Sequence, residues 1–215
     1  KEMLVSYSSP IAATIHGKRH LLCLVRQGLV SLDPETGHVR FKYWFRARDF
    51  ESVNAARPVV IGDQIFLSAA YKTGMALLKV HADGDKYDVV WRDPRGMSTH
   101  WSTAIHRDGC LFGFTGRHEN EGMLQCVEVE SGKLIWETNG FAGNPDDLEQ
   151  DPLTGQIKDA KSGKFVPWPF YGRGSMTFAD GKFFLLGERG TLALARLDRT
   201  GWKEISRTTY RNLKY

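Results

Sequence analysis

The stretch from residue 100 to 138 alternates short apolar runs with polar turns. Its apolar runs are rich in Val, Ile, Leu, Phe and Trp, and they read WSTAIH, CLFGF, MLQCVEVE and KLIWET. β-Branched and aromatic residues favour strands, and the glycines between the runs supply the positive φ that a tight reversal requires. The pattern therefore predicts four short antiparallel strands that form one up-and-down sheet.

The same unit recurs along the chain. A glycine follows each expected first strand, at Gly17, Gly62, Gly109 and Gly181. Tryptophans near the end of the unit repeat with nearly the same spacing, at Trp44, Trp91 and Trp136. A period of about 40–50 residues with four strands per unit is typical of a β-propeller blade. One blade cannot cover both faces of its own sheet, so the repeats are expected to stack around an axis.

We therefore expect an all-β fold, a β-propeller of about four four-stranded antiparallel blades at residues 8–45, 53–93, 99–139 and 173–210. Residues 140–172 form an insertion rich in Asp, Gly and Pro, in which a small hairpin is expected. Four aromatic residues are expected to hold the insertion against the blades: Phe165, Trp168, Phe170 and Tyr171. Residues 1–7 are interpreted as the tail of a preceding blade, and residues 211–215 as a poorly ordered end.

Composition and charge exclude several classes. The chain has 215 residues, 41% hydrophobic and 12% aromatic, which suits a folded core. The net charge of +4 includes no block of Lys or Arg, so a nucleic-acid partner is not expected. No apolar run is long enough to span a membrane. The acidic cluster at residues 146–151 lacks the pattern of a calcium loop, and we interpret it as solvated.

The three cysteines are Cys23, Cys110 and Cys126, without the paired spacing of a metal site. Two alternatives remain for them. They are buried or half-buried free thiols, or Cys110 and Cys126 form a disulfide between neighbouring strands. The first residue is Lys, so the sequence does not reveal the compartment.

A ligand is expected over one end of the blades, because loops at one end of a rigid scaffold carry function. The residues that lead into the inner strands at that end are Tyr7, Asn54, Arg57, His100, Trp101 and Arg173. Arg together with Trp and Tyr is typical of binding hot spots. His100 and Ser102 are interpreted as polar caps of the axial channel, since no nucleophile-elbow motif is present. The leading hypothesis is a non-catalytic scaffold that binds a protein or a glycan.

The turn between the third and fourth strands also carries a motif. It reads Thr or Ser, then Gly, then an aromatic residue four positions later, as in TGHVRF and SGKLIW. This motif resembles the tryptophan-docking motif of pyrroloquinoline-quinone-type propeller repeats. Phe41 and Trp136 match its aromatic position, Trp91 follows a longer turn, and Ile205 departs from it. Residues 6–37 also resemble bacterial quinoprotein alcohol dehydrogenase-like propellers.

The resemblance carries further expectations. An aromatic residue of one blade is expected to pack against the turn of the next. Propellers of this family usually have seven or eight blades. This chain is therefore expected to be part of a larger propeller, to close alone with four blades, or to self-associate through its exposed end blades. A periplasmic or extracytoplasmic location is favoured by the same resemblance.

The resemblance also bears on catalysis. The family's enzymes hold pyrroloquinoline quinone with calcium over the axis and carry two adjacent cysteines, which this chain lacks. We therefore expect no cofactor and no catalytic residues, with the quinone and calcium as the alternative. Two alternative functions remain: a fragment of a quinone-dependent alcohol or sugar dehydrogenase, and an envelope-assembly factor similar to a lipoprotein of the same repeat type.

Overall fold

The computed structural model describes residues 4–210 of the chain. Sheet 1 consists of β1 (Ile11–Ile15), β2 (Lys18–Val25), β3 (Gly28–Leu32) and β4 (Val39–Trp44). Sheet 2 consists of β5 (Val59–Ile61), β6 (Gln64–Ala69), β7 (Gly74–Val80) and β8 (Tyr87–Asp93). Sheet 3 consists of β9 (Ile105–Arg107), β10 (Cys110–Thr115), β11 (Met123–Glu128) and β12 (Leu134–Thr138). Sheet 4 consists of β16 (Ser175–Ala179), β17 (Lys182–Leu186), β18 (Thr191–Asp198) and β19 (Gly201–Thr209).

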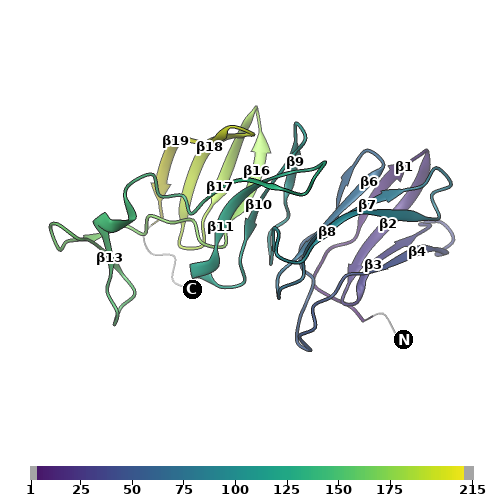
Figure 1. Ribbon diagram of the computed structural model, residues 1–215, viewed down its shortest axis with the longest axis horizontal. Helices are drawn as coiled ribbons and strands as arrows, with labels where there is room; N and C mark the ends of the chain where they lie inside the picture. The colour runs from purple at the N-terminus through teal and green to yellow at the C-terminus, as the bar shows by residue number, and fades with distance from the viewer. Residues whose placement is uncertain (1–3, 211–215) are drawn as a thin grey trace.

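Each of these sheets is antiparallel, and its strands follow one another in sequence order. The prediction of about four four-stranded antiparallel blades is therefore confirmed. Figure 1 shows the four sheets side by side, from sheet 1 at the right to sheet 4 at the left. The first strands of neighbouring sheets contact each other, β5 with β9 and β9 with β16, so these strands are the innermost of the stack.

The turns between the first and second strands explain why the glycine marker recurs. In sheets 1, 3 and 4 the turn is a pair of residues with positive φ, the second of which is glycine: His16-Gly17, Asp108-Gly109 and Asp180-Gly181. Two consecutive positive φ values match the right-handed twist of the flanking strands, and glycine adopts them without steric cost. Sheet 2 differs, because its glycine, Gly62, is the first of the two turn residues, with a φ of 60°, and Asp63 is the second. The repeat was visible in the sequence because this local requirement recurs in every blade.

A β-bulge in the fourth strand recurs in every sheet and sets the position of the docking aromatic. In sheets 2 and 3 the residue just after the bulge is Trp91 or Trp136. The indole N–H of Trp91 donates a hydrogen bond to the carbonyl oxygen of Val129 in sheet 3, at 2.9 Å. The indole N–H of Trp136 donates to the carbonyl oxygen of Asp198 in sheet 4, at 2.8 Å. Each tryptophan thus joins its own sheet to the turn of the next one.

Sheet 1 docks on sheet 2 with Phe41 at the position after the bulge. The rings of Phe41 and Tyr87 lie 5.1 Å apart, and the Tyr87 hydroxyl donates to the carbonyl oxygen of Lys42 at 3.0 Å. Trp44 lies three residues beyond Phe41 and is 51% exposed. Trp44 is therefore not the equivalent of Trp91, and the spacing between these two tryptophans does not mark equivalent positions. In sheet 4, Ile205 is skipped by the bulge.

Three apolar cores fill the spaces between neighbouring sheets. One lies between sheets 1 and 2, one between sheets 2 and 3, and one between sheets 3 and 4. Representative members are, in that order, Leu22 and Ile65, Leu77 and Leu111, and Phe112 and Phe183. Burying one such side chain stabilises the fold by about 1.5–3 kcal/mol. Among the residues that the structure describes, no core joins sheet 4 to sheet 1, and these sheets lie at opposite ends of the row (Figure 1).

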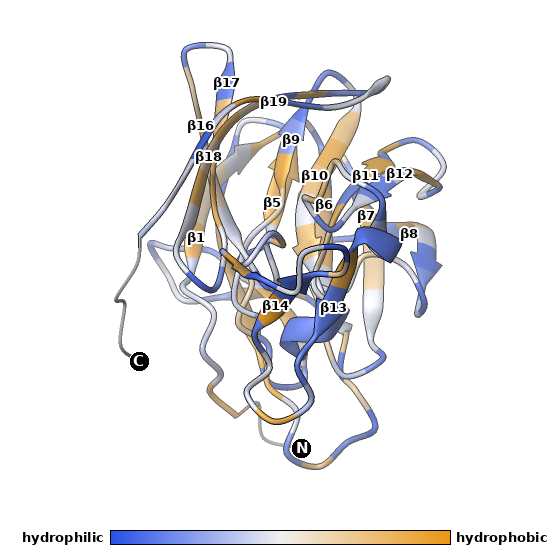
Figure 2. Cartoon of the chain, turned by 90° about the vertical axis from the view of Figure 1, so that its left-hand side faces the viewer, coloured by the Kyte–Doolittle hydropathy of each residue, from blue (hydrophilic) through white to orange (hydrophobic). Residues whose placement is uncertain are grey.

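Residues 140–172 carry a small three-stranded sheet made of β13 (Leu148–Gln150), β14 (Ile157–Asp159) and β15 (Phe165–Val166). Single 3-10 turns lie at Glu119–Glu121 and Pro145–Asp147. Figure 2 shows that this small sheet and its mainly hydrophilic loops lie in front of the apolar blade strands. Only part of the expected aromatic patch holds the insertion: Tyr171 is fully buried between sheets 3 and 4, whereas Phe165 is 55% exposed.

All three cysteines are free thiols, so the alternative of a disulfide between Cys110 and Cys126 is wrong. The two side chains interact across neighbouring strands, where Cys126 pairs with Phe112 rather than with Cys110. Burial, together with the neighbouring Cys110 thiol, raises the pKa of Cys126 to about 12. Residues 4–7 form no strand, and the remainder of the expected preceding blade and the expected disordered end at 211–215 lie outside the described residues.

Candidate ligand-binding face

Two kinds of loop gather at one end of the stack, which we call the loop end. They are the turns between second and third strands and the connections from one sheet to the next. The other end carries the tight turns between first and second strands and between third and fourth strands. All six residues proposed from the sequence precede a first strand: Tyr7, Asn54, Arg57, His100, Trp101 and Arg173. The alternation of strand direction therefore brings their backbone segments to the loop end.

Three of these residues form a row of rings with Tyr71. Tyr7 and Trp101 meet edge to face with ring centroids 5.7 Å apart, and His100 lies 4.5 Å from Trp101. Tyr71 continues the row, 5.3 Å from His100. Tyr7 is 68% exposed and Trp101 is 57% exposed, so one end of this aromatic row faces solvent. Two large exposed aromatics in contact provide an amphipathic surface of the kind that binding sites use.

His100 is the buried member of the aromatic row, with 7% of its surface exposed. Burial lowers its pKa, and the nearby charges of Arg173 and Arg117 lower it further. Neither ring nitrogen has a hydrogen-bond partner of normal geometry among the described residues, although the Arg117 backbone lies close enough to favour the charged form. The imidazole is therefore neutral at physiological pH, and it packs as a ring rather than acting as a cation.

Arg173 and Arg117 close the other end of the row. The guanidinium of Arg117 lies over the Tyr71 ring, 4.3 Å from its centroid. Arg173 donates from Nη1 to the carbonyl oxygen of Arg117 at 2.9 Å and from Nε to the Glu188 carboxylate at 3.0 Å. This hydrogen-bonded ion pair raises the pKa of Arg173. Arg173 therefore clamps the connection into sheet 4 onto a loop of sheet 3.

The two remaining residues take different positions. Asn54 is 3% exposed, and its side-chain amide donates to the carbonyl oxygens of Val25 and Phe45 at 2.9 and 3.2 Å. The backbone carbonyl oxygen of Asn54 accepts a hydrogen bond from the backbone N–H of Tyr7 at 3.1 Å, so Asn54 positions Tyr7 from beneath the surface. The backbone N–H of Arg57 donates to Thr103 Oγ1 at 3.1 Å, and its side chain is exposed.

Tyr71 and Arg117 join His100 to Arg173 but were not predicted from the sequence. Both residues lie in turns between second and third strands, whereas all six predicted residues precede first strands. One signal was present in the sequence: the turn YKTG places an aromatic and a cation where turn-forming residues usually stand. A large aromatic side chain at an expected turn position is thus the sequence signal for Tyr71.

Within residues 4–210, no group of three or more His, Cys, Asp or Glu side chains comes close enough together to hold a metal ion. The acidic segment of the insertion is instead paired with lysines. Asp151 accepts a hydrogen bond from Lys158 Nζ at 2.7 Å, which lowers the pKa of its carboxyl, and Asp147 pairs with Lys161 at 2.8 Å. The helical turns in the described part of the chain are too short to span a lipid bilayer.

No protein-family model matches the sequence, and no curated protein matches it. The structure is similar to the crystal structure of the computationally designed Ika4 protein, with a TM-score of 0.52 and 9% sequence identity over 92% of this chain and 99% of that one. It also matches BamB from Moraxella catarrhalis with a TM-score of 0.42 and 13% identity, over 97% of this chain and 71% of that one. At 9% identity the similarity to the designed protein concerns the fold alone. The four stacked antiparallel blades identify that fold as a β-propeller.

Proposed function

We propose that this chain is a non-catalytic β-propeller scaffold that binds a protein or glycan partner over its loop end. The observation that carries the proposal is the aromatic row, in which Tyr7 and Trp101 contact each other and remain more than half exposed. Asn54 fixes the backbone of Tyr7, and the buried ring of His100 supports Trp101. An exposed aromatic pair that is held from below loses little conformational entropy when a partner covers it.

The proposal includes the repeat type. The bulge that places Trp91 and Trp136 on the turns of the next sheet supports repeats of the pyrroloquinoline-quinone type, although no family model matches. The proposal also includes an extracytoplasmic location and the absence of a cofactor. Both follow from the sequence resemblance and await their own tests.

A binding screen tests the function. Purified protein is applied to a glycan array and to a displayed peptide library, and the affinity of each ligand found is measured by biolayer interferometry. Tyr7→Ala with Trp101→Ala is expected to weaken binding by about tenfold or more, since paired aromatic hot spots contribute about 2 kcal/mol or more. The matched control is Phe165→Ala, an aromatic of similar exposure in the insertion, which is expected to leave the affinity unchanged.

Two outcomes contradict the proposal. The first is a ligand whose affinity is unchanged by the double substitution at Tyr7 and Trp101. The second is saturable binding of pyrroloquinoline quinone with calcium, followed in an absorbance titration, because a bound redox cofactor would make the chain part of a dehydrogenase.

A further inference from the structure

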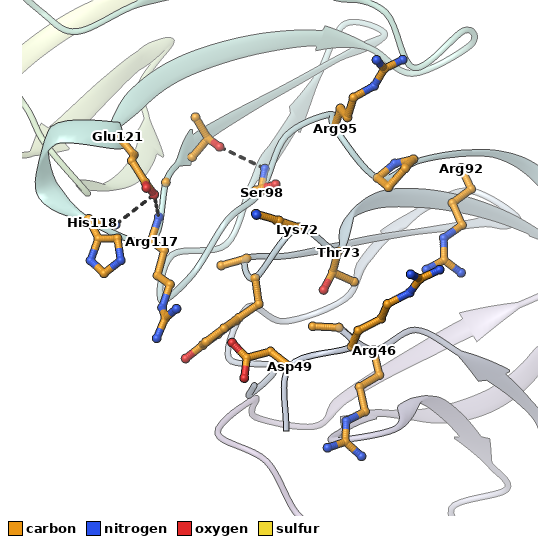
Figure 3. A pocket seen from close by; sticks show the side chains of 17 residues that line it. Arg46, Asp49, Lys72, Thr73, Arg92, Arg95, Ser98, Arg117, His118 and Glu121 are labelled. Carbon is orange, nitrogen blue, oxygen red and sulfur yellow. Dashed lines mark hydrogen bonds between the residues drawn. The ribbon is translucent and has the colours of Figure 1, made fainter. Parts of the chain in front are cut away.

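A second surface at the loop end lies beside the aromatic row. It is a cleft of about 1160 Å³ between the loops of sheets 1, 2 and 3. Its basic side chains come from four separate segments: Arg46, Arg48, Lys72, Arg92, Arg95 and Arg117. Figure 3 shows Lys72 and Thr73 near the centre of the hollow, with Arg117 and Arg92 on opposite sides of it. The cleft meets the aromatic row at Tyr71 and Arg117, but most of its lining is separate from that row.

The cleft has a strong excess of positive charge. Six cationic side chains face two carboxylates, Asp49 and Glu121, which gives a formal net charge of about +4 when His118 is not counted. The carboxylate of Glu121 is occupied by the backbone N–H groups of Arg117 and His118, at 2.9 and 3.2 Å, and these hydrogen bonds lower its pKa. A cleft lined by one sign of charge focuses the field and raises the local concentration of anions.

None of the six cations forms an ion pair with a carboxylate among residues 4–210. Some arginines elsewhere do form such pairs: Arg189 pairs with Glu119, and Arg207 pairs with Glu204. Arg46 and Arg92 donate to backbone carbonyl oxygens, at 3.2 and 3.5 Å. Like charges that gather without counterions destabilise the free protein, so the arrangement favours a ligand that brings negative charge.

The backbone beside the cleft adopts an unfavourable conformation. Tyr71 and Lys72 are consecutive non-glycine residues that both have a φ of 59°, in a turn closed by the Thr73 N–H donating to the Ala70 carbonyl oxygen at 3.2 Å. Turns of this type strongly prefer Asn-Gly, because most side chains disfavour positive φ. Strained residues of this kind gather at functional sites. Here the turn holds a phenol and an ammonium in the lining of the cleft.

A buried hydroxyl in the lining also lacks a partner. Thr73 is 3% exposed, and its Oγ1 makes no hydrogen bond within the described part of the chain. Figure 3 shows Thr73 near the middle of the cleft, between Lys72 and Arg46. A buried polar group without a partner costs stability unless a ligand satisfies it. Thr73 is therefore placed to bond a ligand oxygen.

We propose that this cleft binds an acidic oligosaccharide, a chain of sugar units that carries carboxylate groups. Planar guanidinium groups match carboxylates, and the hydroxyls of Thr73, Ser98 and Thr115 suit sugar hydroxyls. The volume exceeds the roughly 300–1,000 Å³ of typical small-molecule sites, which favours an oligomer. The only aromatic rings among the described lining residues are Tyr71 and His118, fewer than a stack of nucleobases needs.

Isothermal titration with an oligogalacturonate tests the proposal. The variant Arg48→Gln with Lys72→Gln removes two cations whose side chains form no hydrogen bond or ion pair with the rest of residues 4–210, so the fold is expected to be retained. We expect the affinity to fall about tenfold or more. The matched control is Arg196→Gln with Lys203→Gln. It removes two exposed cations that are paired on neighbouring strands of sheet 4, and it is expected to change the affinity less than about twofold. Thr73→Val is expected to weaken binding several-fold.

Several results would overturn the proposal. One is equal binding of a neutral malto-oligosaccharide of the same length, because the charge would then play no part. Another is tighter binding of polyglutamate or of a single-stranded oligonucleotide, which would identify a different class of ligand. A third is the absence of oligogalacturonate binding at low salt. None of these results bears on the aromatic row, whose test depends on Tyr7 and Trp101.

Discussion

Removing the indole of Trp91 tests how neighbouring sheets depend on one another. This side chain lies on the last strand of sheet 2 and reaches the turn of sheet 3, where its indole N–H donates to the Val129 carbonyl oxygen at 2.9 Å. Its ring also lies against Gly132, where an added Cβ would come within 3.0 Å of the indole. Two substitutions separate these contributions: Trp91→Phe removes the hydrogen bond, and Trp91→Ala removes the packing as well.

The expected magnitudes follow from the contacts. Loss of one such hydrogen bond costs about 1 kcal/mol, and more where the Val129 carbonyl is left without a donor. Replacing a buried Trp by Ala costs about 3–5 kcal/mol, and Trp91 is only partly buried, so the lower end applies. We therefore expect a decrease in the free energy of unfolding of about 1 kcal/mol for Trp91→Phe and about 3 kcal/mol for Trp91→Ala.

Urea unfolding followed by circular dichroism measures these changes. The neighbouring Val90 is 42% exposed, and Val90→Ala serves as the control with an expected change below about 0.5 kcal/mol. The reasoning is refuted if Trp91→Ala unfolds with the same midpoint as the control. It is also refuted if Trp91→Ala gives a separate early transition while the rest of the protein unfolds at the wild-type midpoint, since stacked repeats stabilise one another through their interfaces.

Three further predictions concern single positions. Thr73→Val removes a buried hydroxyl without a partner and is expected to raise the melting temperature, measured by scanning calorimetry; a lower value would contradict it. Below a pH of about 6.5, His100 binds a proton in the unfolded chain more readily than in the folded one, so the free energy of unfolding decreases as the pH is lowered. His100→Phe is expected to flatten this pH dependence in urea melts, and an unchanged slope would count against it. Phe184 and Leu186 expose 44% and 46% of their surface on the outer face of sheet 4, and replacing both with Lys is expected to reduce association seen by light scattering; a wild-type chain that stays monomeric at high concentration would contradict it.

The fold was predictable because its signals are local. Each first turn needs positive φ, so a glycine recurs at Gly17, Gly62, Gly109 and Gly181. The aromatic after the bulge was found for Phe41 and Trp136 from its distance to the preceding glycine. Trp44 was misread as part of the repeat because sequence spacing alone does not show where the bulge falls.

The candidate site was less predictable because its parts come from different sheets. Tyr7, His100 and Trp101 could be chosen, since each leads into a first strand. Asn54 was chosen for the same reason, but its amide is turned inward to hold the backbone. The basic cleft was not predicted, because none of the segments that line it carries a block of Lys or Arg in the sequence. Only the stacking of three sheets brings the cations together.

The claim that the loop end carries the binding surfaces is tested most directly by hydrogen–deuterium exchange, with and without saturating oligogalacturonate. We predict that ligand slows exchange in the segments 46–49, 70–73 and 115–121, which line the cleft. The turns at the opposite end, at residues 33–38 and 129–133, are predicted to exchange at unchanged rates. Protection at those turns, or along the outer face of sheet 4, would contradict the account.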